Sequence, residues 1–384
     1  MQLDIFSQMY PSFKFNKPIA LIELFGGYGS QALALKYLGA NFKHHKLCEW
    51  NYKSFQAYKD IHIVDDTDYS KDLTTEDIKQ YLFDKGISSN WNEPMTKDQV
   101  FRLNEKQART IYNNIKATHN LVNIQQVKGE DLEITEKDKY QYLMTYSFPC
   151  QDLSLAGNQK GMSDTSTRSG MLWEVERILK ECKELNQLPD CLLMENVPMV
   201  HSKDNVKDFT KWINSLEELG YKNYYKDLIA TDYGIPQTRN RCFMVSVLGD
   251  YSYTFPEPIE LKTKLKDFLE INVDKKYYLS DKMIEGMIHT EFNSYKLDYC
   301  LQDKGGNIST LTTRTGDKAP LLIRDIPETL NIKNANSKGY LEAEVGDGID
   351  ISSRMESHRG TVQKNKAQTI TTMGGNNIGV VVDE

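Results

Sequence analysis

A cysteine that directly follows an apolar stretch is the first residue whose type and setting suit chemistry. Cys150 lies in the segment Ser147-Phe148-Pro149-Cys150-Gln151, immediately after an apolar run. A thiolate is a strong nucleophile, and positive charge nearby favours it by lowering the pKa of the thiol. The position predicts a nucleophile at the ligand-binding end of a strand. A lone cysteine is, however, more often a buried packing residue, so Cys150 alone leaves both interpretations open.

Two more groups of polar residues flank apolar runs and suit the same chemistry. Glu195 and Asn196 come directly after the run 191–194, which would bring a carboxylate to the same edge. Gln237-Thr238-Arg239-Asn240-Arg241 precedes another run and supplies two guanidinium groups on alternate residues. Taken singly, the carboxylate is compatible with helix capping and the arginines with surface ion pairs. Their joint order and spacing predict one site with a carboxylate and two cations around the thiol.

A glycine-rich turn earlier in the chain has the pattern of a nucleotide-binding loop. In Phe25-Gly26-Gly27-Tyr28-Gly29-Ser30-Gln31-Ala32, the residues Gly27, Gly29 and Ala32 match G-x-G-x-x-[GA] between a strand and a helix. Glycine there permits a tight turn and the close approach of a ligand. Glu49 ends the next expected strand, where an acid can bind ribose hydroxyls. These residues suit a nicotinamide enzyme, an S-adenosylmethionine enzyme or a purely structural turn.

The elements that would position these residues alternate between strand and helix. Apolar runs predict strands over residues 19–24, 43–48, 142–147, 191–194, 224–229 and 242–248. Helices are expected over residues 31–38, 170–185 and 206–219, the second of them opened by the segment Arg168-Ser169-Gly170-Met171-Leu172-Trp173-Glu174. The alternation predicts an α/β fold with a doubly wound, mostly parallel sheet. Such a sheet binds its ligands at the carboxyl ends of the strands.

The chain changes character after about residue 250, where Phe255-Pro256-Glu257-Pro258 resembles a linker. Threonine-rich runs at 310–313 and 369–372 are each followed by a polar, glycine-containing turn and an aliphatic strand, which predicts two β-hairpins. We therefore expect two domains, a catalytic domain over 1–250 and a smaller β-rich domain over 251–384. Residues 70–130 have the composition of a polar, largely helical insertion, and no function is assigned to them.

Composition narrows the class of protein. The chain has 384 residues and six cysteines, none in a C-x-x-C pair, so neither a zinc site nor a disulfide framework is expected. His44 and His45 are adjacent but lack partners at zinc spacing, so no metal is expected. No apolar stretch is long enough to span a bilayer, and no signal peptide is recognised. The net charge of −7 argues weakly against a nucleic-acid partner without excluding one, since such footprints are local.

Over roughly residues 18–250 the sequence resembles the DNA (cytosine-5) methyltransferases. Phe148-Pro149-Cys150-Gln151 resembles their nucleophile motif, Glu195-Asn196-Val197 their acid motif, and Gln237-x-Arg239-x-Arg241 the motif before their recognition domain. The glycine-rich turn resembles their cofactor motif. The pair of Pro-Cys-Gln and Glu-Asn-Val is specific, although one tRNA-modifying branch shares it. A nicotinamide enzyme would leave both motifs without a purpose.

The resemblance implies a Rossmann-like S-adenosylmethionine-dependent fold and a set of site residues. The catalytic residues would be Cys150, Glu195, Arg239 and Arg241. S-adenosyl-L-methionine would be bound by Phe25, Gly26, Gly27, Tyr28, Gly29, Ser30, Glu49, Trp50, Asp131, Pro149 and Leu172. Cytosine would be held by Phe148, Gln151, Asn196 and Gln237. Glu49 is expected on the ribose, with Trp50 beside the adenine. Asp131, in the blurred motif Gly129-Glu130-Asp131-Leu132, is expected to contact the adenine.

The resemblance also implies covalent catalysis. Cys150 would add to C6 of cytosine so that C5 accepts the methyl group, with Arg239 or Arg241 favouring the thiolate. Glu195 would hold N3 and the exocyclic amine, and Arg241 would hold O2. A base would then remove the C5 proton and the thiolate would leave. The cytosine must be flipped out of double-stranded DNA, and the C-terminal hairpins would contact neighbouring bases in the major groove.

The sequence departs from the family after the expected recognition region. Family members end with an Arg-Lys-Leu-Thr-Pro-Arg-Glu-like helix start and a Gly-Asn-Ser-Val-like segment, and neither is recognised here. The turn Gly374-Gly375-Asn376-Asn377 is only superficially similar to the second. One hypothesis is the N-terminal subunit of a split methyltransferase, with a second chain supplying these motifs. The other is a truncated chain with little or no activity. The intact catalytic set favours the split enzyme.

Three functions are compatible with these motifs. We expect an intracellular, bacterial or phage-encoded DNA cytosine-5 methyltransferase of restriction–modification or phage type. The first alternative is a tRNA cytosine-5 methyltransferase with the same motifs. The second is a DNA-binding module that keeps the fold without turnover. The large, hairpin-rich second domain favours DNA, because hairpins suit contacts in the grooves of a duplex.

Overall fold

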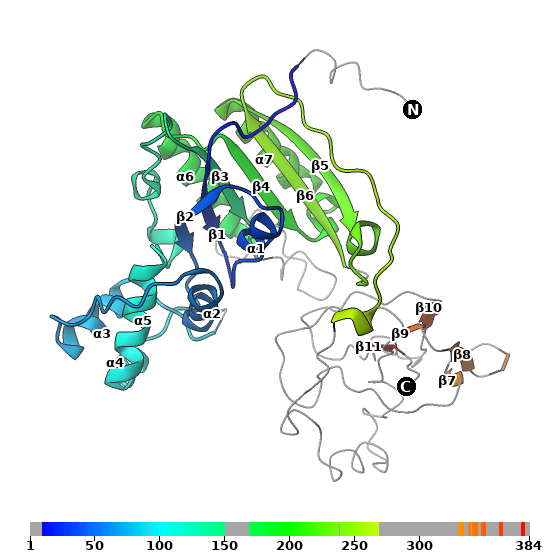
Figure 1. Ribbon diagram of the computed structural model, residues 1–384, viewed down its shortest axis with the longest axis horizontal. Coiled ribbons are helices and arrows are strands. Elements are labelled where there is room, and N and C mark those ends of the chain that lie inside the picture. Colours follow the sequence, from blue (N-terminus) through cyan, green and yellow to red (C-terminus); the bar gives the residue numbers. More distant parts are fainter. Residues whose placement is uncertain are drawn as a thin grey trace, which may run out of the picture. The chain divides into compact units, whose positions relative to one another are not determined.

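The chain forms two compact units (Figure 1), and each is built from sequence segments that are not contiguous. The computed structural model describes residues 10–90, 92–149, 169–237, 239–268, 329–333, 337–338, 340–344, 347–350, 361–363 and 378–380. The first unit comprises Met1–Lys226 and Cys242–Phe255, and the second comprises Asp227–Arg241 and Pro256–Glu384. The division into a catalytic domain over 1–250 and a smaller β-rich domain over 251–384 stays a prediction.

A six-stranded sheet runs through the first unit. Its strands, in the spatial order β2-β1-β3-β4-β6-β5, are β1 (Ile19–Leu24), β2 (Phe42–Cys48), β3 (Gln141–Tyr146), β4 (Cys191–Asn196), β5 (Tyr221–Ile229) and β6 (Asn240–Leu248). β1 pairs in parallel with β2 and with β3, and β3 pairs in parallel with β4. β6 runs antiparallel to β4. The sheet is therefore mostly parallel, and all six expected strands are present near their expected positions.

The central strands bury side chains on both faces, as expected for strands inside a parallel sheet. On β1, Ala20, Ile22 and Leu24 belong to one apolar cluster, whereas Ile19 and Leu21 belong to another. Successive side chains of a strand point to opposite faces, so this split places one cluster on each side of the sheet. The apolar runs in the sequence lack a polar face because neither side of these strands meets water.

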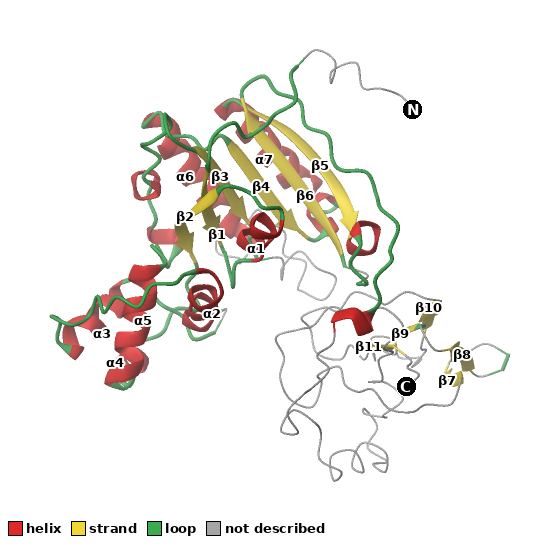
Figure 2. Ribbon diagram, in the orientation of Figure 1, coloured by secondary structure: helices red, strands yellow, loops and turns green. Residues whose placement is uncertain are grey.

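Helices cover both faces (Figure 2). α6 (Leu172–Glu184) and α7 (Val206–Leu219) supply most of the helical residues in the cluster on one face, and α1 (Ser30–Tyr37) packs against the other. α7 buries Trp212 completely, and the indole N–H of Trp212 donates a 3.2 Å hydrogen bond to the hydroxyl of Tyr146. Gly220 ends α7 in the left-handed region (φ 102°), where glycine carries no steric penalty. These helices confirm the expected doubly wound arrangement.

The segment between β2 and β3 is largely helical, as its composition predicted. It contains α2 (Tyr52–His62), α3 (Thr75–Asp84), α4 (Lys97–Phe101) and α5 (Glu105–Ala117), followed by two short 3₁₀ helices, Ile124–Gln126 and Gly129–Leu132. α2 to α5 share an apolar cluster of their own that reaches β2 through Leu47. Thr96 and Asn104 begin α4 and α5 with reciprocal capping bonds to the glutamine three residues later.

The described part of the second unit contains short antiparallel strands. β7 (Thr329–Lys333) pairs with β8 (Tyr340–Glu344), and β9 (Gly348–Asp350) lies between β10 (Thr361–Gln363) and β11 (Ile378–Val380). The β-rich character agrees with the expectation. The hairpin predicted around 310–323 lies outside the described residues, as does the first strand of the hairpin predicted around 369–382. Within the described residues β11 pairs with β9, and the predicted hairpins stay predictions.

The order of the strands creates a switch point between β1 and β3. From β1 the chain moves outward to β2, whereas from β3 it moves to β4 on the other side. The connections that leave β1 and β3 therefore diverge, and a crevice at their carboxyl ends is the usual ligand site of such sheets. The glycine-rich turn follows β1 and the Phe148-Pro149 segment follows β3, so both predicted motifs lie at this edge. In the described parts of the chain, no helix has the length and apolarity that a membrane crossing requires.

Candidate cofactor and catalytic site

The glycine-rich turn between β1 and α1 has a backbone that other residues adopt with difficulty. Phe25, Gly27 and Gly29 have φ values of 56°, 55° and 84°, in the left-handed region. A Cβ at Gly26 would lie 2.5 Å from Leu47 Cδ1, and one at Gly29 would lie 2.4 Å from His62 Nε2. Gly29 N–H donates to Gly26 C=O at 2.8 Å and closes the turn. The glycines are thus needed both for conformation and for close packing beneath the turn.

Glu49 ties the end of β2 to this turn. One of its carboxylate oxygens accepts from Gly27 N–H at 3.0 Å and the other accepts from Asn51 N–H at 2.8 Å. The side chain is buried, and burial raises the pKa of the carboxyl group although these backbone bonds lower it. Each carboxylate oxygen has two lone pairs, so both can still accept a further hydrogen bond. Glu49 therefore fits a ligand that carries neighbouring hydroxyl groups, such as a ribose.

A second buried acid lies directly below the turn. Glu23 on β1 accepts from the Tyr58 hydroxyl at 2.5 Å and from Ala32 N–H at 3.3 Å, so it joins β1 to α2 and to the first turn of α1. Tyr58 also contacts His44 Nδ1 at 2.7 Å. Burial raises the pKa of Glu23 to about 7. Burial also lowers the pKa of His44 to about 4, and the neighbouring His62 and Lys36 lower it further. The turn therefore rests on a buried polar network.

The motifs after β3 and β4 are joined by a hydrogen bond. Asn196 Nδ2 donates to Phe148 C=O at 3.0 Å, and Asn196 Oδ1 accepts from Val197 N–H at 2.8 Å. Phe148 and Asn196 are both buried, whereas Glu195 and Pro149 are half-buried. Because β3 and β4 are parallel neighbours, their carboxyl ends lie side by side, and Asn196 holds the Phe148-Pro149 segment to the end of β4. The structure thus brings two predicted motifs into contact.

Other predicted site residues differ in exposure. Tyr28 is 63% exposed and Ser30 is also exposed, so both face outward from the glycine-rich turn. Leu172, at the start of α6, is buried in the core, and Trp50 packs partly buried against the α2–α5 cluster. The nucleophile predicted at 150 and its neighbour at 151 lie outside the described residues, so Cys150 and Gln151 stay predictions.

Gln237, Arg239 and Arg241 belong to the second unit, and their roles at the site stay predictions. Within that unit, Arg239 C=O accepts from Ala230 N–H at 2.9 Å and Gln237 N–H donates to Ile235 C=O at 2.7 Å. The first of these bonds brings Arg239 back against Ala230 ahead of β6. In the first unit, β6 continues from Cys242, which pairs with Asn196.

Asp131 is not brought together with Glu49. Its carboxylate accepts from Lys128 N–H at 2.8 Å and caps the 3₁₀ helix Gly129–Leu132. The next residue, Leu132, contacts His45 through its C=O at 2.9 Å, and His45 lies before the end of β2. Asp131 is therefore placed along the middle of β2, away from the carboxyl edge, and its predicted contact with an adenine stays untested.

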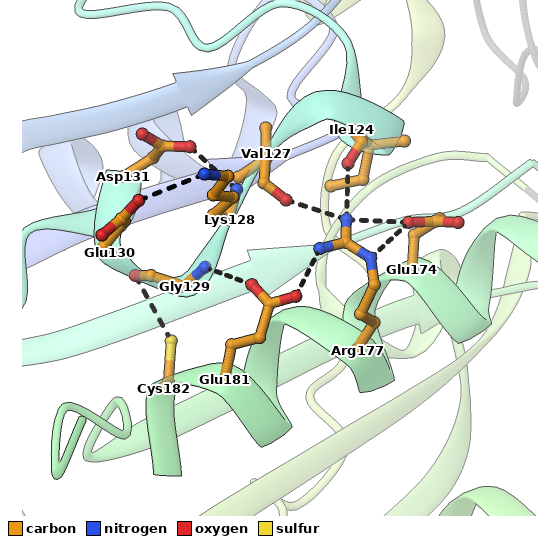
Figure 3. Close-up of polar contacts among 10 residues, drawn as sticks. All are labelled: Ile124, Val127, Lys128, Gly129, Glu130, Asp131, Glu174, Arg177, Glu181 and Cys182. Carbon is orange, nitrogen blue, oxygen red and sulfur yellow. Dashed lines mark hydrogen bonds and ion pairs between the residues drawn. The ribbon is translucent and has the colours of Figure 1, made fainter. Parts of the chain in front are cut away.

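Arg177 on α6 anchors the segment that contains Asp131 (Figure 3). Its guanidinium donates to Val127 C=O at 2.8 Å and to Ile124 C=O at 3.3 Å, and it forms 2.8 Å ion pairs with Glu174 and Glu181. Glu181 in turn accepts from Gly129 N–H at 2.7 Å. A Cβ at Gly129 would lie 2.8 Å from the backbone N of residue 182, so only glycine permits this approach. The cluster is structural and holds residues 124–129 against α6.

The structure reveals functional candidates that the sequence motifs missed. Glu23 supports the glycine-rich turn, and Asn120 lies beside Glu49, to which it forms two hydrogen bonds. Val122 follows with φ 69°, a rare conformation for a β-branched residue. Glu23 and Asn120 belong to none of the recognised motifs. Asn120 and Glu49 are 71 positions apart in the sequence, so spacing could not have identified their contact.

A family model and curated proteins match this chain. The model described as C-5 cytosine-specific DNA methylase matches residues 84–374. The chain is 34% identical over 272 residues to the type II methyltransferase M2.ScrFI of Lactococcus lactis subsp. cremoris, covering 69% of this chain and 71% of that protein. It is 35% identical over 287 residues to the orphan methyltransferase M.SssI of Spiroplasma monobiae, covering 73% of this chain and 72% of that protein.

Solved structures with a similar course of the chain include methyltransferases. The Entamoeba histolytica methyltransferase EhMeth aligns with a TM-score of 0.45 and 18% identity, covering 71% of this chain and 67% of that chain. The Dnmt2 methyltransferase of S. pombe aligns with a TM-score of 0.42 and 16% identity, covering 70% and 65% respectively.

The buried carboxyl of Glu23 generates a prediction about stability and pH. The pKa of Glu23 is about 7 in the folded chain, whereas its ordinary value is 4.5. The contribution of Glu23 to the unfolding free energy is therefore full below pH 4.5 and is lost as the pH rises to 7. His44 acts oppositely between pH 4 and 6.5, because the unfolded chain binds its proton more tightly. At about 1.4 kcal/mol per pKa unit, the Glu23 contribution lost is about 3 kcal/mol.

The variant Glu23→Gln keeps an acceptor for Tyr58 but cannot titrate. We therefore expect the unfolding free energy of the wild type, relative to this variant, to fall by about 3 kcal/mol between pH 4.5 and 7. Urea denaturation at several pH values measures it. A difference between the two proteins that stays constant with pH contradicts the assignment of a buried neutral carboxyl.

A second prediction concerns Arg177. Replacing it with alanine removes the guanidinium that donates to Val127 C=O, while Ile124 C=O keeps only its bond from Val127 N–H. We therefore expect a loss of about 1–2 kcal/mol in unfolding free energy and faster hydrogen exchange over residues 124–132. Lys180→Ala on the same helix removes an exposed ion pair with Glu176 and should cost less than about 0.5 kcal/mol. Equal exchange in both variants would show that Arg177 does not anchor this segment.

Proposed function

Because the chain belongs to the C-5 cytosine-specific DNA methylase family, we propose that it transfers a methyl group from S-adenosyl-L-methionine to C5 of cytosine in double-stranded DNA. The observation that carries the proposal is the hydrogen bond from Asn196 to Phe148. It joins the segment that leads into Cys150 to the segment that carries Glu195, at the carboxyl ends of β3 and β4. The bond supports the proposal because the two segments with the proposed nucleophile and acid follow neighbouring parallel strands.

S-adenosyl-L-methionine is bound at the turn after β1 and at the end of β2. When bound, it supplies an electrophilic methyl group. Glu49 accepts hydrogen bonds from the ribose hydroxyls through lone pairs that Gly27 and Asn51 leave free. The left-handed backbone at Gly27 and Gly29 supports a ligand close to the main chain. Phe25, Trp50 and Pro149 are proposed to supply apolar contacts. Leu172 is buried in the core and Asp131 caps a 3₁₀ helix, so these two contacts have the least support from the structure.

The chain supplies covalent activation of the cytosine. The thiolate of Cys150 adds to C6, and the electron pair of the C5–C6 bond becomes available at C5. C5 would then take the methyl group from the sulfonium of S-adenosyl-L-methionine, whose S–CH3 bond breaks to release S-adenosyl-L-homocysteine. Glu195 binds N3 and the exocyclic amine and stabilises the charge that develops on the ring, with Arg241 at O2 and Arg239 nearby. A base then removes the proton from C5, the C5–C6 double bond re-forms, and the thiolate leaves. Phe148, Gln151, Asn196 and Gln237 are the residues proposed to hold the cytosine.

Duplex DNA is the proposed substrate, with the cytosine flipped out of the stack because the reacting atoms are inaccessible inside a duplex. The matching family model supports DNA, since it is described as a C-5 cytosine-specific DNA methylase. The β-rich second unit is proposed as the target-recognition domain, where short hairpins and loops suit base contacts in the major groove. Transfer to tRNA is the alternative that an experiment must separate.

The test is methyl transfer by the purified chain from tritiated S-adenosyl-L-methionine into mixed-sequence duplex DNA and, separately, into tRNA. We expect label in DNA, and we expect Cys150→Ala to lower it by about 10³-fold or more, because the thiol forms the covalent bond. Cys191→Ala is the matched control. Its thiol is buried in the core, where burial raises its pKa to about 12, so most of the activity should remain.

Each other result has a definite meaning. Label in tRNA but not in DNA would replace the proposed substrate, and equal labelling by wild type and Cys150→Ala would contradict covalent catalysis. Binding of the cofactor without transfer, with transfer restored by a second polypeptide that carries the family's final motifs, would support the expected second chain. Absence of cofactor binding would contradict the proposed site itself.

A further inference from the structure

The side chain of Asn120 forms hydrogen bonds to both peptide groups of Glu49. Its Oδ1 accepts from Glu49 N–H at 3.1 Å, and its Nδ2 donates to Glu49 C=O at 2.9 Å. Oδ1 also accepts from Val122 N–H at 2.9 Å, so both lone pairs of the amide oxygen are used. Asn120 is only 5% exposed. A buried amide with three backbone partners fixes all of them in one arrangement.

The bonds between Asn120 and Glu49 lie directly after the end of β2. Residues 119–121 run beside β2, where Leu121 N–H donates to Leu47 C=O at 2.7 Å and Leu47 forms a parallel bridge with Asn120. β2 ends at Cys48, so main-chain pairing of the strand does not extend to Glu49. The amide of Asn120 takes over that pairing for one further residue. The bond to Val122 N–H holds the chain in the turn where Val122 has φ 69°.

The orientation of the Glu49 carboxylate depends on its backbone. From this fixed backbone the side chain reaches Gly27 N–H on one side and Asn51 N–H on the other. A rotation of the Glu49 peptide would move both carboxylate oxygens away from the turn. The buried N–H and C=O of Glu49 would also lose their partners if Asn120 were removed, and buried peptide groups do not stay unpaired.

We propose that Asn120 is a positioning residue for ribose recognition: it holds the main chain of Glu49 so that the carboxylate faces the glycine-rich turn and the two hydroxyl groups of a bound ribose. The inference rests on the proposed function, because it takes Glu49 as the ribose-binding acid. Asn120 touches no substrate and acts only through Glu49.

The test compares two ligands that differ only in the ribose hydroxyls. Calorimetry measures the Kd of S-adenosyl-L-homocysteine and of its 2′,3′-dideoxy analogue for the full chain. We expect the wild type to prefer the ribose form by about tenfold or more, since hydrogen bonds to a charged acceptor are strong. Asn120→Ala should reduce this preference by about fivefold or more. In a Glu49→Gln background, Asn120→Ala should cause no further loss of preference.

Two further variants separate positioning from stability. Asn120→Asp keeps the oxygen that accepts from Glu49 N–H and Val122 N–H, but it replaces the amide donor to Glu49 C=O by a carboxylate oxygen that repels this carbonyl, so it should also lose part of the preference. Asn205→Ala is the matched control: Asn205 is also 5% exposed and bonds Met199 C=O and Ser202 Oγ, far along the chain from β2. It should keep the wild-type preference whatever its effect on stability.

The outcomes distinguish this inference from the proposed function. An unchanged ribose preference in folded Asn120→Ala and Asn120→Asp overturns the positioning role while methyl transfer by the wild type stands. A wild type that binds both ligands equally also overturns it, because Glu49 would not be recognising the hydroxyls. A wild type that binds neither ligand overturns the inference together with the proposed cofactor site.

Discussion

The parallel pairing of β1 with β2 on one side and with β3 on the other is the constraint on which the rest of the site depends. Parallel strands end at the same edge of a sheet, so the segments that follow them lie close together at that edge. The turn after β1, the acid after β2 and the segment before position 150 lie between residues 25 and 149 of the chain. The sheet alone brings them to one crevice.

The same edge concentrates buried polar groups, and each of them binds backbone. Glu49 accepts from the turn after β1, Asn120 grips Glu49, and Asn196 holds the segment after β3. Glu23 supports the turn from below. Buried polar groups are costly unless they are paired, so these residues stabilise the fold only in the arrangement that also forms the site. Stability and the geometry of ligand binding therefore depend on the same bonds.

The sequence predicts part of this arrangement well. β1 and β3 stand out because two buried faces require continuous apolar runs, and α7 begins and ends where its period and Gly220 indicate. Relationships between distant residues escape such patterns. No local run of residues indicates that β6 is antiparallel to β4. Glu49, which Asn120 binds, lies 71 positions away in the sequence. Asp131 matched a blurred motif by its letters, but its carboxylate serves as a helix cap.

If Cys150 attacks a cytosine extruded from duplex DNA, the two are joined for a time by a covalent bond. Duplex DNA that carries 5-fluorocytosine traps this complex, because fluorine cannot leave as a proton does. After incubation with S-adenosyl-L-methionine, proteolysis and mass spectrometry would locate the adduct. We expect a cofactor-dependent adduct on the peptide that contains Cys150. An adduct on another cysteine, or methyl transfer to normal DNA with no trapped complex on fluorinated DNA, would contradict it.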